Sequence, residues 1–216
     1  MPTGITYRYL RWFHKYSKVV LVPTESMKKE LETRGFKNIK IWTRGVGKDL
    51  IAVRESSRKH TPLKVLYVGR VSIEKNLDDL CKLQDNYNIT IVGDGPYLKH
   101  LKRTYKNINF VGYKFGKELK DEYIKNDVFC FPSLTDTFGI VIIEALCNGL
   151  PVAAYNVTGP RDILEYGITG YMVQTGNDLS KAIEMCKSID NVKVQDLSVK
   201  KWTWKNCFDI FLEAIK

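Results

Sequence analysis

The chain has 216 residues, of which 44% are hydrophobic and 27% charged. These proportions are ordinary for a globular protein and exclude disordered and fibrous classes. The sequence has no apolar run of the roughly 18 residues that a membrane-spanning helix requires, and no apolar signal core near its start. The net charge of +10 is uneven, because residues 1–60 hold 14 basic and 5 acidic residues while the remainder is nearly neutral.

The basic first segment has several candidate partners. An anionic membrane surface, a nucleic acid or an acidic protein would each be attracted by such an excess of positive charge. A solvated basic surface without any partner is the alternative. We expect no nucleic-acid partner, because the basic residues form no aromatic-interleaved platform and no recognition motif.

The cysteines and histidines suggest neither disulfides nor a metal centre. The five cysteines lie far apart within apolar segments, which indicates buried free thiols and a cytoplasmic location. The three histidines have no neighbouring cysteine, and the sequence contains no Asp-x-Asp motif that would hold a divalent cation. We therefore expect no metal and no cofactor.

Residues 1–50 have the pattern of a small α/β unit. A helix is expected at about 4–17, a strand at 19–22, a helix opened by Thr24 or Ser26 and stopped by Gly35, and a strand at 38–42. The stretch that follows is polar, lacks sustained periodicity and ends at Pro62. We expect a linker over residues 51–62.

Residues 63–200 alternate apolar strands with helical patterns. Strands are expected at 64–68, 89–92, 108–111, 128–131, 152–155 and 171–173. Helices are expected at about 76–84, 96–105, 117–125, 139–148, 177–189 and, beyond this region, 204–215. Near-continuous apolar strands alternating with helices indicate a parallel sheet covered on both faces. The prediction is a doubly wound α/β domain with its ligand site beyond the carboxyl ends of the strands.

Two of the strand-end loops contain candidate ligand-binding residues. Residues 69–76 place Arg70 and Lys75 near a helix start, where cations and helix dipole would both favour a diphosphate. Solvated surface charges are the alternative, and the pattern alone favours them. The next loop contains Gly93, which either lines a nucleotide cleft or belongs to a tight turn after which Pro96 opens a helix. These two readings of Gly93 are equally supported.

A third loop joins the strand at 128–131 to an apolar helix beginning near Gly139. Asp136 in this loop is either a functional carboxylate or an N-terminal cap. Glu144 lies inside the helix among apolar neighbours, where a carboxylate is costly to bury without partners. A lysine on a polar face or the hydroxyl pair of a ligand would satisfy it. The amides of Phe138, Gly139 and Ile140 would be free to bind an anion.

These residues carry a resemblance to a known family. Asp136 and Glu144 are separated by seven residues and are flanked by Phe-Gly and Gly-Leu-Pro-Val, which resembles the carboxylate pair of retaining glycosyltransferases. The chain resembles glycosyltransferase family 4, the group 1 family, whose GT-B fold has two Rossmann-like halves. The Gly-Arg, Gly-Asp-Gly-Pro and Val-Gly-Tyr segments extend the resemblance over residues 62–175. One departure is Asp136, since the family more often has Glu there.

The resemblance implies a role for each of these positions. Arg70 and Lys75 would hold the diphosphate of a UDP- or GDP-linked sugar, and Glu144 would bind its ribose hydroxyls. The remaining positions implied are Gly69 and Gly93 along the donor, Tyr113 and Lys114 near the base, and Asp136 with the amides of Phe138, Gly139 and Ile140 at the transferred sugar and phosphate. Asp136 and Glu144 would be the catalytic pair.

The implied reaction is hexosyl transfer with retention to a lipid or glycan acceptor, as in lipopolysaccharide or glycolipid biosynthesis. Residues 1–50 resemble only the end of an acceptor-side half, and residues 201–216 resemble the helix that crosses both halves. We therefore expect a truncated or split enzyme that binds mainly the donor. A separate chain carrying the other half, or a homo-oligomer, would complete it.

Two alternatives remain open at this stage. One is a stand-alone enzyme of minimal form, completed by oligomerisation. The other is a non-catalytic binding or scaffold protein whose basic first segment contacts a membrane or a partner chain. Peripheral attachment to the cytoplasmic face of an anionic membrane would suit a lipid-linked acceptor.

Overall fold

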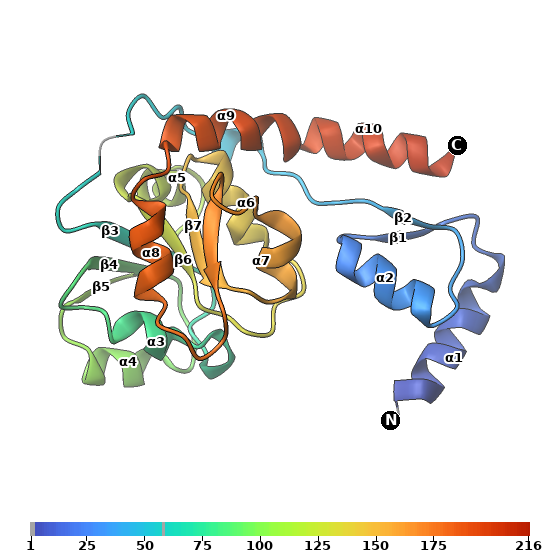
Figure 1. Ribbon diagram of the computed structural model, residues 1–216, viewed down its shortest axis with the longest axis horizontal. Coiled ribbons are helices and arrows are strands. Elements are labelled where there is room, and N and C mark those ends of the chain that lie inside the picture. Colours follow the sequence, from blue (N-terminus) through green and yellow to red (C-terminus); the bar gives the residue numbers. More distant parts are fainter. Residues whose placement is uncertain (1–2, 58) are drawn as a thin grey trace.

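The computed structural model describes residues 3–57 and 59–216. It consists of a larger body, a smaller N-terminal unit, and a pair of consecutive helices, α9 and α10, that runs from one to the other (Figure 1). Within the described residues, no helix is both long enough and apolar enough to cross a bilayer.

The body is built on a parallel sheet. Among the residues described, six strands form it in the order β5-β4-β3-β6-β7-β8. Their bounds are β3 (Lys64–Val68), β4 (Asn88–Val92), β5 (Ile108–Gly112), β6 (Val128–Phe131), β7 (Val152–Tyr155) and β8 (Gly170–Val173). All the expected strands of this region are confirmed to within one residue. Chain order runs outward in opposite directions from β3 and β6, so a topological switch point lies between these strands.

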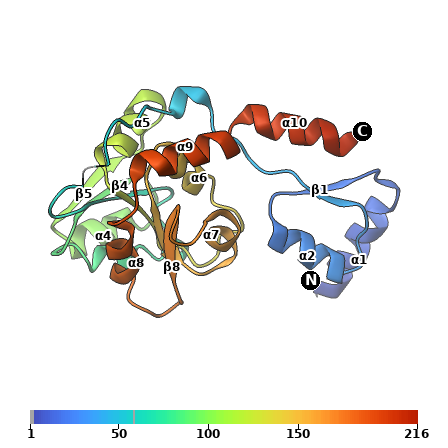
Figure 2. The same cartoon turned by 45° about the horizontal axis from the view of Figure 1, so that its top comes forward.

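Helices cover both faces of this sheet. The helices α3 (Leu77–Cys81), α4 (Leu98–Thr104) and α8 (Ser180–Cys186) lie on one face, and α5 (Gly116–Lys125), α6 (Ile140–Cys147) and α7 (Thr158–Ile163) on the other. Outside α6 lies α9 (Asn191–Lys201) (Figure 2). Because both faces are covered, strands such as β6 and β7 are buried along their whole length. The predicted doubly wound, Rossmann-like α/β fold is confirmed.

Several local predictions need correction. The helix α4 begins at Leu98, so Pro96 does not open it but lies in the turn before it. The helices α3 and α8 are shorter than their patterns suggested. Neither α7 nor α9 was anticipated. The chain 158–163 contains Gly-Pro, and the chain 191–201 carries valines at alternating positions, which is a strand-like pattern.

The N-terminal unit contains α1 (Thr3–Phe13), a 3-10 turn (His14–Tyr16), β1 (Val20–Val22), α2 (Glu25–Thr33) and β2 (Ile39–Ile41). The strands β1 and β2 pair in parallel. Of the two candidate caps for α2, the structure uses Thr24, whose Oγ1 accepts a hydrogen bond from the Met27 amide at 3.2 Å. The buried core of this unit, within the described residues, consists of Val22, Phe36 and Ile39.

The C-terminal helix α10 (Trp204–Ile215) lies beside the N-terminal unit. The ring of Trp42 lies 5.3 Å from that of Phe211, and Lys40 Nζ donates to the Ala214 carbonyl at 3.2 Å. At a second junction, Ser26 Oγ donates to Asp162 Oδ1 at 2.6 Å. These contacts join the N-terminal unit to α10 and to α7 of the body.

Candidate functional site

The loops at the carboxyl ends of β3 and β4 approach each other backbone to backbone. Gly69 donates its amide to the Val92 carbonyl at 3.0 Å. Gly93 has φ +137°, and a Cβ at this position would lie 1.9 Å from the Gly69 carbonyl oxygen. A side chain is therefore excluded at Gly93 by backbone that has little room to move. This close approach supports the tight-turn reading of Gly93, which also lies on the wall of a pocket.

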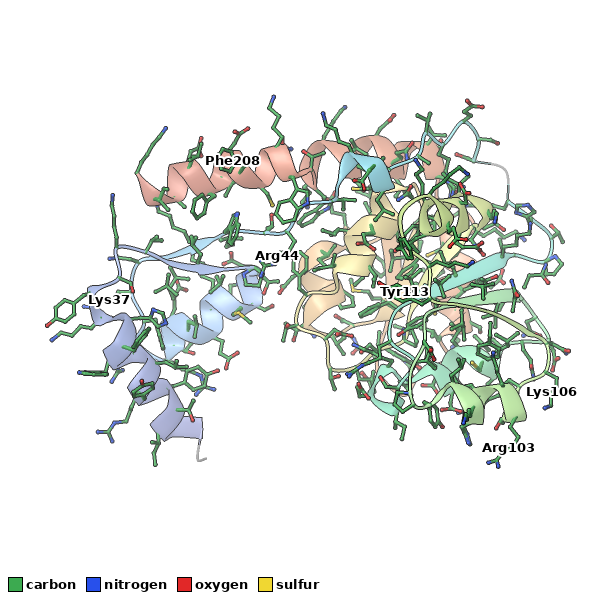
Figure 3. The ribbon with its side chains drawn as sticks, turned by 180° about the vertical axis from the view of Figure 1, so that it is seen from behind. Lys37, Arg44, Arg103, Lys106, Tyr113 and Phe208 are labelled. Atoms are coloured by element: carbon green, nitrogen blue, oxygen red, sulfur yellow. The ribbon has the colours of Figure 1, made fainter. Side chains whose placement is uncertain are left out.

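That pocket opens beside the ends of β3, β4 and β5 and the first turns of α6, with a volume of about 510 Å³. Its lining includes six residues that the sequence had singled out for donor binding: Gly69, Arg70, Gly93, Tyr113, Lys114 and Glu144. It also includes Asp94, Leu119 and Val141, together with two strand-end valines. Figure 3 locates Tyr113 on the body, well away from Lys37 of the N-terminal unit. The structure thus brings together residues from three loops and from the helices α5 and α6.

Arg70 stands at the mouth of this pocket with most of its side chain exposed. Its guanidinium forms an ion pair with Glu74, four residues further along the chain. Its backbone carbonyl accepts a hydrogen bond from the Tyr67 hydroxyl at 3.0 Å. The backbone of Arg70 is fixed by this contact, while an exposed ion pair of this kind contributes little energy and its cation can exchange partners.

Lys75 and Asp136 form an ion pair at the switch point between β3 and β6. Lys75 Nζ lies 2.7 and 2.8 Å from the two carboxylate oxygens of Asp136. Their side chains are 19% and 25% exposed, so the pair is shielded but reachable. The reading of Asp136 as a helix cap is wrong, because α6 is preceded by Gly139 and has no side-chain cap. Neither Lys75 nor Asp136 lines the pocket itself.

Glu144 projects from α6 into the pocket lining. The alternative that a lysine pairs with it is wrong. Its Oε2 instead accepts a hydrogen bond from the Tyr123 hydroxyl at 2.8 Å. Burial raises the pKa of the Glu144 carboxyl, and the hydrogen bond from Tyr123 opposes that rise. Nothing in the sequence pattern had pointed to Tyr123.

The residues that begin α6 are arranged as an open helix end. Gly139 has φ +85°, which favours glycine, and its carbonyl accepts from the Ile142 amide at 2.9 Å. The side chain of Phe138 turns away into the core, with its ring 6.2 Å from that of Trp202. Ile140 is half exposed. The first amides of a helix have no partner within it, so this end can donate to an anion.

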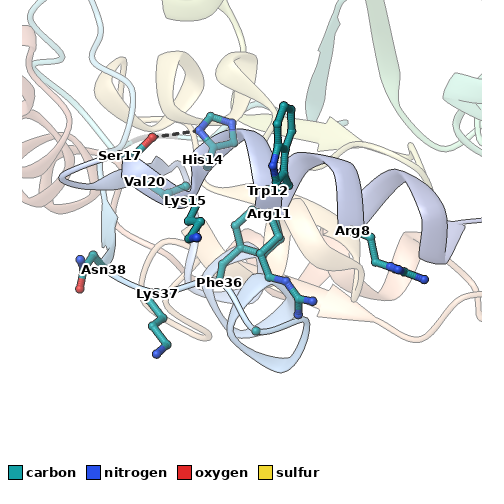
Figure 4. Close-up of a pocket in the computed structure, with 11 residues that line it drawn as sticks. Arg8, Arg11, Trp12, His14, Lys15, Ser17, Val20, Phe36, Lys37 and Asn38 are labelled. Atoms are coloured by element: carbon teal, nitrogen blue, oxygen red, sulfur yellow. Dashed lines mark hydrogen bonds between the residues drawn. The ribbon is translucent and has the colours of Figure 1, made fainter.

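A second pocket, of about 470 Å³, lies in the N-terminal unit between α1, the start of β1 and the loop 35–38 that joins α2 to β2 (Figure 4). The cations of Arg8, Arg11, Lys15 and Lys37 surround it, and Trp12 forms part of its wall. The sequence predicted basic charge in this region but gave no indication of a pocket. It faces the amino ends of the strands, away from the residues 42–47 that lead to the body.

Comparison with known proteins gives these positions a context. Residues 51–193 match the family described as "Glycosyl transferases group 1". The chain is 31% identical over 189 residues to the sulfoquinovosyl transferase SQD2 of Arabidopsis thaliana. The aligned region covers 78% of this chain and 37% of that protein. It is also 31% identical over 186 residues to a GDP-mannose-dependent alpha-mannosyltransferase of Mycobacterium tuberculosis, covering 82% and 49%. The chain thus spans less than half the length of these relatives.

Solved structures share the fold of the chain as a whole. HepE of Anabaena, solved in complex with UDP and glucose, superposes with a TM-score of 0.79 at 16% identity over 99% of this chain and 67% of that one. The lipopolysaccharide outer core galactosyltransferase WaaB, in its apo form, superposes with a TM-score of 0.77 at 20% identity over 93% and 62%. At these identities the similarity establishes the fold alone.

Proposed function

Because the chain belongs to the group 1 glycosyltransferase family, we propose that the pocket beside β3, β4 and β5 binds a nucleotide-diphosphate sugar. The protein would transfer a hexose from that donor, with retention at the anomeric carbon, to a lipid or glycan acceptor. The observation that carries this proposal is the convergence of Gly69, Arg70, Gly93, Tyr113, Lys114 and Glu144 on one cavity. It lies at the carboxyl edge of a doubly wound sheet, where ligands of such folds bind.

The proposed site divides the donor among its chemical groups. The Glu144 carboxylate would accept hydrogen bonds from the ribose hydroxyls, and Tyr113 with Lys114 would lie near the base. Arg70 and Lys75 would hold the diphosphate, which carries its charge beside the open end of α6. Asp136, 2.7 Å from Lys75, would face the transferred sugar. The lysine and aspartate are already placed together before a donor arrives.

The same groups would stabilise the transition state of transfer. As the glycosidic bond to the diphosphate breaks, the sugar gains oxocarbenium character and the leaving nucleoside diphosphate gains negative charge. Cations and helix-end amides fixed in advance stabilise developing charge without reorganising. Arg70, Lys75 and the amides that begin α6 would supply this stabilisation from the chain itself. HepE was solved with UDP and a relative is named for GDP-mannose, so both nucleotides are candidate donors.

The proposed enzyme also needs a site that binds the acceptor. We assign this site to the N-terminal unit together with further structure packed against it. The helix α1 exposes a row of large apolar side chains: Ile5, Tyr9, Trp12 and Phe13, followed by Tyr16. Parallel sheets are normally covered on both faces, and two short parallel strands make a small core. We propose that further α/β structure covers this row, supplied by a longer polypeptide, a separate chain or a second copy.

A second candidate function is binding at an anionic surface without catalysis. The cluster of Arg8, Arg11, Lys15 and Lys37 around one pocket, with Trp12 beside it, favours this candidate (Figure 4). Cations next to aromatic side chains suit a membrane interface rich in anionic lipid. The proposal places the protein in the cytoplasm, at the inner face of such a membrane. Failure of anionic vesicles to retain the protein at low salt would remove this candidate.

Calorimetric titration tests the donor site. The wild type would be titrated with UDP, GDP and their glucose and mannose conjugates, alongside Arg70→Ala and Glu144→Ala. Lys117→Ala is the matched control, because Lys117 is an exposed cation that pairs with Asp121 on α5, away from the pocket. The proposal predicts that one nucleotide binds the wild type and the control, and binds both site variants much more weakly. Equal binding to all four proteins would contradict it.

A further inference from the structure

The helix α5 is polar along nearly its whole length and buries one residue. Within α5, every residue of which is described, that residue is Tyr123. It is fully buried, with its ring 6.3 Å from that of Phe129 in β6. Its hydroxyl donates to Glu144 Oε2 at 2.8 Å. A buried hydroxyl needs a partner, and this one is the carboxylate that lines the candidate donor pocket.

The carboxylate of Glu144 is left with one oxygen in use and one available. Oε2 accepts from Tyr123, while the described residues provide no hydrogen-bond donor for Oε1. Its neighbours on α6, Ile143 and Ala145, are fully buried and apolar. A glutamate has three rotatable bonds and would sample several directions from such a position. The bond from Tyr123 selects one direction, so that the unpaired oxygen is presented at the pocket.

The two helices that carry this pair are tied together at their ends. Arg54 Nη2 donates to the carbonyls of Tyr123 at 2.9 Å and of Asn126 at 3.2 Å, both at the end of α5. Arg54 Nε donates to the carbonyl of Asn148, which follows α6, at 3.0 Å. Because one guanidinium bridges both helix ends, the spacing between Tyr123 and Glu144 is fixed from outside the pocket.

We propose that Tyr123 is a positioning residue, which orients the Glu144 carboxylate so that Oε1 accepts a hydrogen bond from the ribose of the bound nucleotide. This inference rests on the proposed donor site. Tyr123 is not among the residues that line the pocket, but it would control how strongly the pocket prefers ribonucleotides. A nucleotide without ribose hydroxyls gains nothing from an oriented carboxylate, so selectivity is the property that should change when Tyr123 is altered.

The test compares UDP with 2′,3′-dideoxyuridine diphosphate, or the guanosine pair if GDP is the nucleotide that binds. A hydrogen bond to a charged group predicts that the wild type prefers the ribonucleotide by about 10-fold or more. In Tyr123→Phe this preference should fall by about fivefold or more, mainly through weaker binding of the ribonucleotide. Tyr105→Phe removes the same atom from a tyrosine whose hydroxyl donates to Asp78, away from the pocket, and should keep the preference.

Each outcome is informative. An unchanged preference in Tyr123→Phe, with the wild type still discriminating, overturns the role of Tyr123 and leaves the donor site standing. Binding of neither nucleotide to the wild type overturns both. If Tyr123→Phe does not fold, ring signals of Tyr123 in the NMR spectrum of the wild type answer the same question. They should shift with the ribonucleotide and not with its dideoxy analogue, and identical shifts with both would overturn the inference.

Discussion

The molecule contains two parallel sheets that differ in how completely they are covered. In the body, helices cover both faces of the sheet and the strands β6 and β7 are fully buried. In the N-terminal unit, β1 and β2 are short and only partly buried, and the helix α1 exposes aromatic side chains such as Trp12 and Phe13. The body therefore has an extensive buried core, while the N-terminal unit exposes apolar side chains, which supports the proposal that further structure covers this unit.

Charge follows the same division. The first 60 residues carry an excess of nine positive charges, and the remaining 156 are nearly neutral. In the body, cations such as Lys75 and Arg70 are matched by nearby carboxylates. In the N-terminal unit, Arg8, Arg11 and Lys15 surround a pocket. Among the described residues, no acidic side chain lines this pocket. This contrast supports the proposal that the body would bind a small anion, while the N-terminal unit would contact a larger anionic surface.

The largest effect is expected from Gly93→Ala, which tests how closely the loops after β3 and β4 pack in the body. The new Cβ would lie 1.9 Å from the Gly69 carbonyl oxygen at a φ of +137°. We expect a loss of about 3 kcal/mol or more in the free energy of unfolding, measured with denaturant. Gly176→Ala is the control, because Gly176 has φ +87° and open space around it, and should cost about 1–2 kcal/mol. Equal losses would contradict close packing of the two loops.

Lys75→Ala tests whether the lysine of the shielded ion pair in the body binds a phosphate group of the ligand. Loss of a charged hydrogen bond to a phosphate should weaken nucleotide binding about 10-fold to 100-fold, measured by calorimetry. Lys82→Ala is matched to it, since Lys82 also pairs with an aspartate, Asp79, but its side chain is largely exposed to solvent. The control should bind like the wild type. If both variants bind alike, Lys75 only balances the charge of Asp136.

Glu144→Gln tests whether the buried carboxylate of Glu144 lowers the stability of the folded chain. Burial raises the pKa of Glu144, so the folded chain takes up its proton more readily than the unfolded chain. Its contribution to stability is therefore present at low pH and is lost as pH rises and the buried carboxyl must ionise. The advantage in Tm of Glu144→Gln over the wild type should grow as the pH rises above 4.5, the ordinary pKa of this carboxyl. Glu213→Gln, on exposed α10, should show no such trend, and a flat difference for Glu144→Gln would refute the expectation.

The smallest effect is expected from Trp12→Ser in the uncovered unit. The side chain of Trp12 is 68% exposed, so its removal should change the free energy of unfolding by less than about 0.5 kcal/mol. Trp202→Ser provides the contrast, because Trp202 is buried against Phe138. This substitution should lower the free energy of unfolding by about 3–5 kcal/mol. A loss above about 1 kcal/mol for Trp12→Ser would show that this face is already covered within the chain.

The sheet of the body could be predicted from sequence because its strands are short, continuous apolar runs. The stretch Val128–Phe131 has no polar position, as a strand buried on both faces requires. The helix α9 could not be predicted in this way, since Val192 and Val194 alternate with polar residues and only packing on α6 selects a helix. Tertiary contact overrides a weak local pattern there.

The site was predictable as single residues and not as contacts. Lys75 and Asp136 were each recognised from their loops, yet they are 61 residues apart and meet only because β3 and β6 are neighbours. Tyr123 gave no signal, because a lone aromatic residue on a polar helix has the ordinary pattern of a core contact. Arg54 lies in a polar stretch with no periodicity, and its role in joining the ends of α5 and α6 depends on the folded chain.

In the proposed function, the donor nucleotide binds in the pocket of the body. Hydrogen–deuterium exchange of the wild-type chain, with and without saturating UDP or GDP, tests it most directly. We expect slower exchange at residues 68–70, 92–94 and 113–114 and at the beginning of α6, with α1 unchanged. Protection confined to α1 and the cationic pocket beside it, or no protection with either nucleotide, would contradict it.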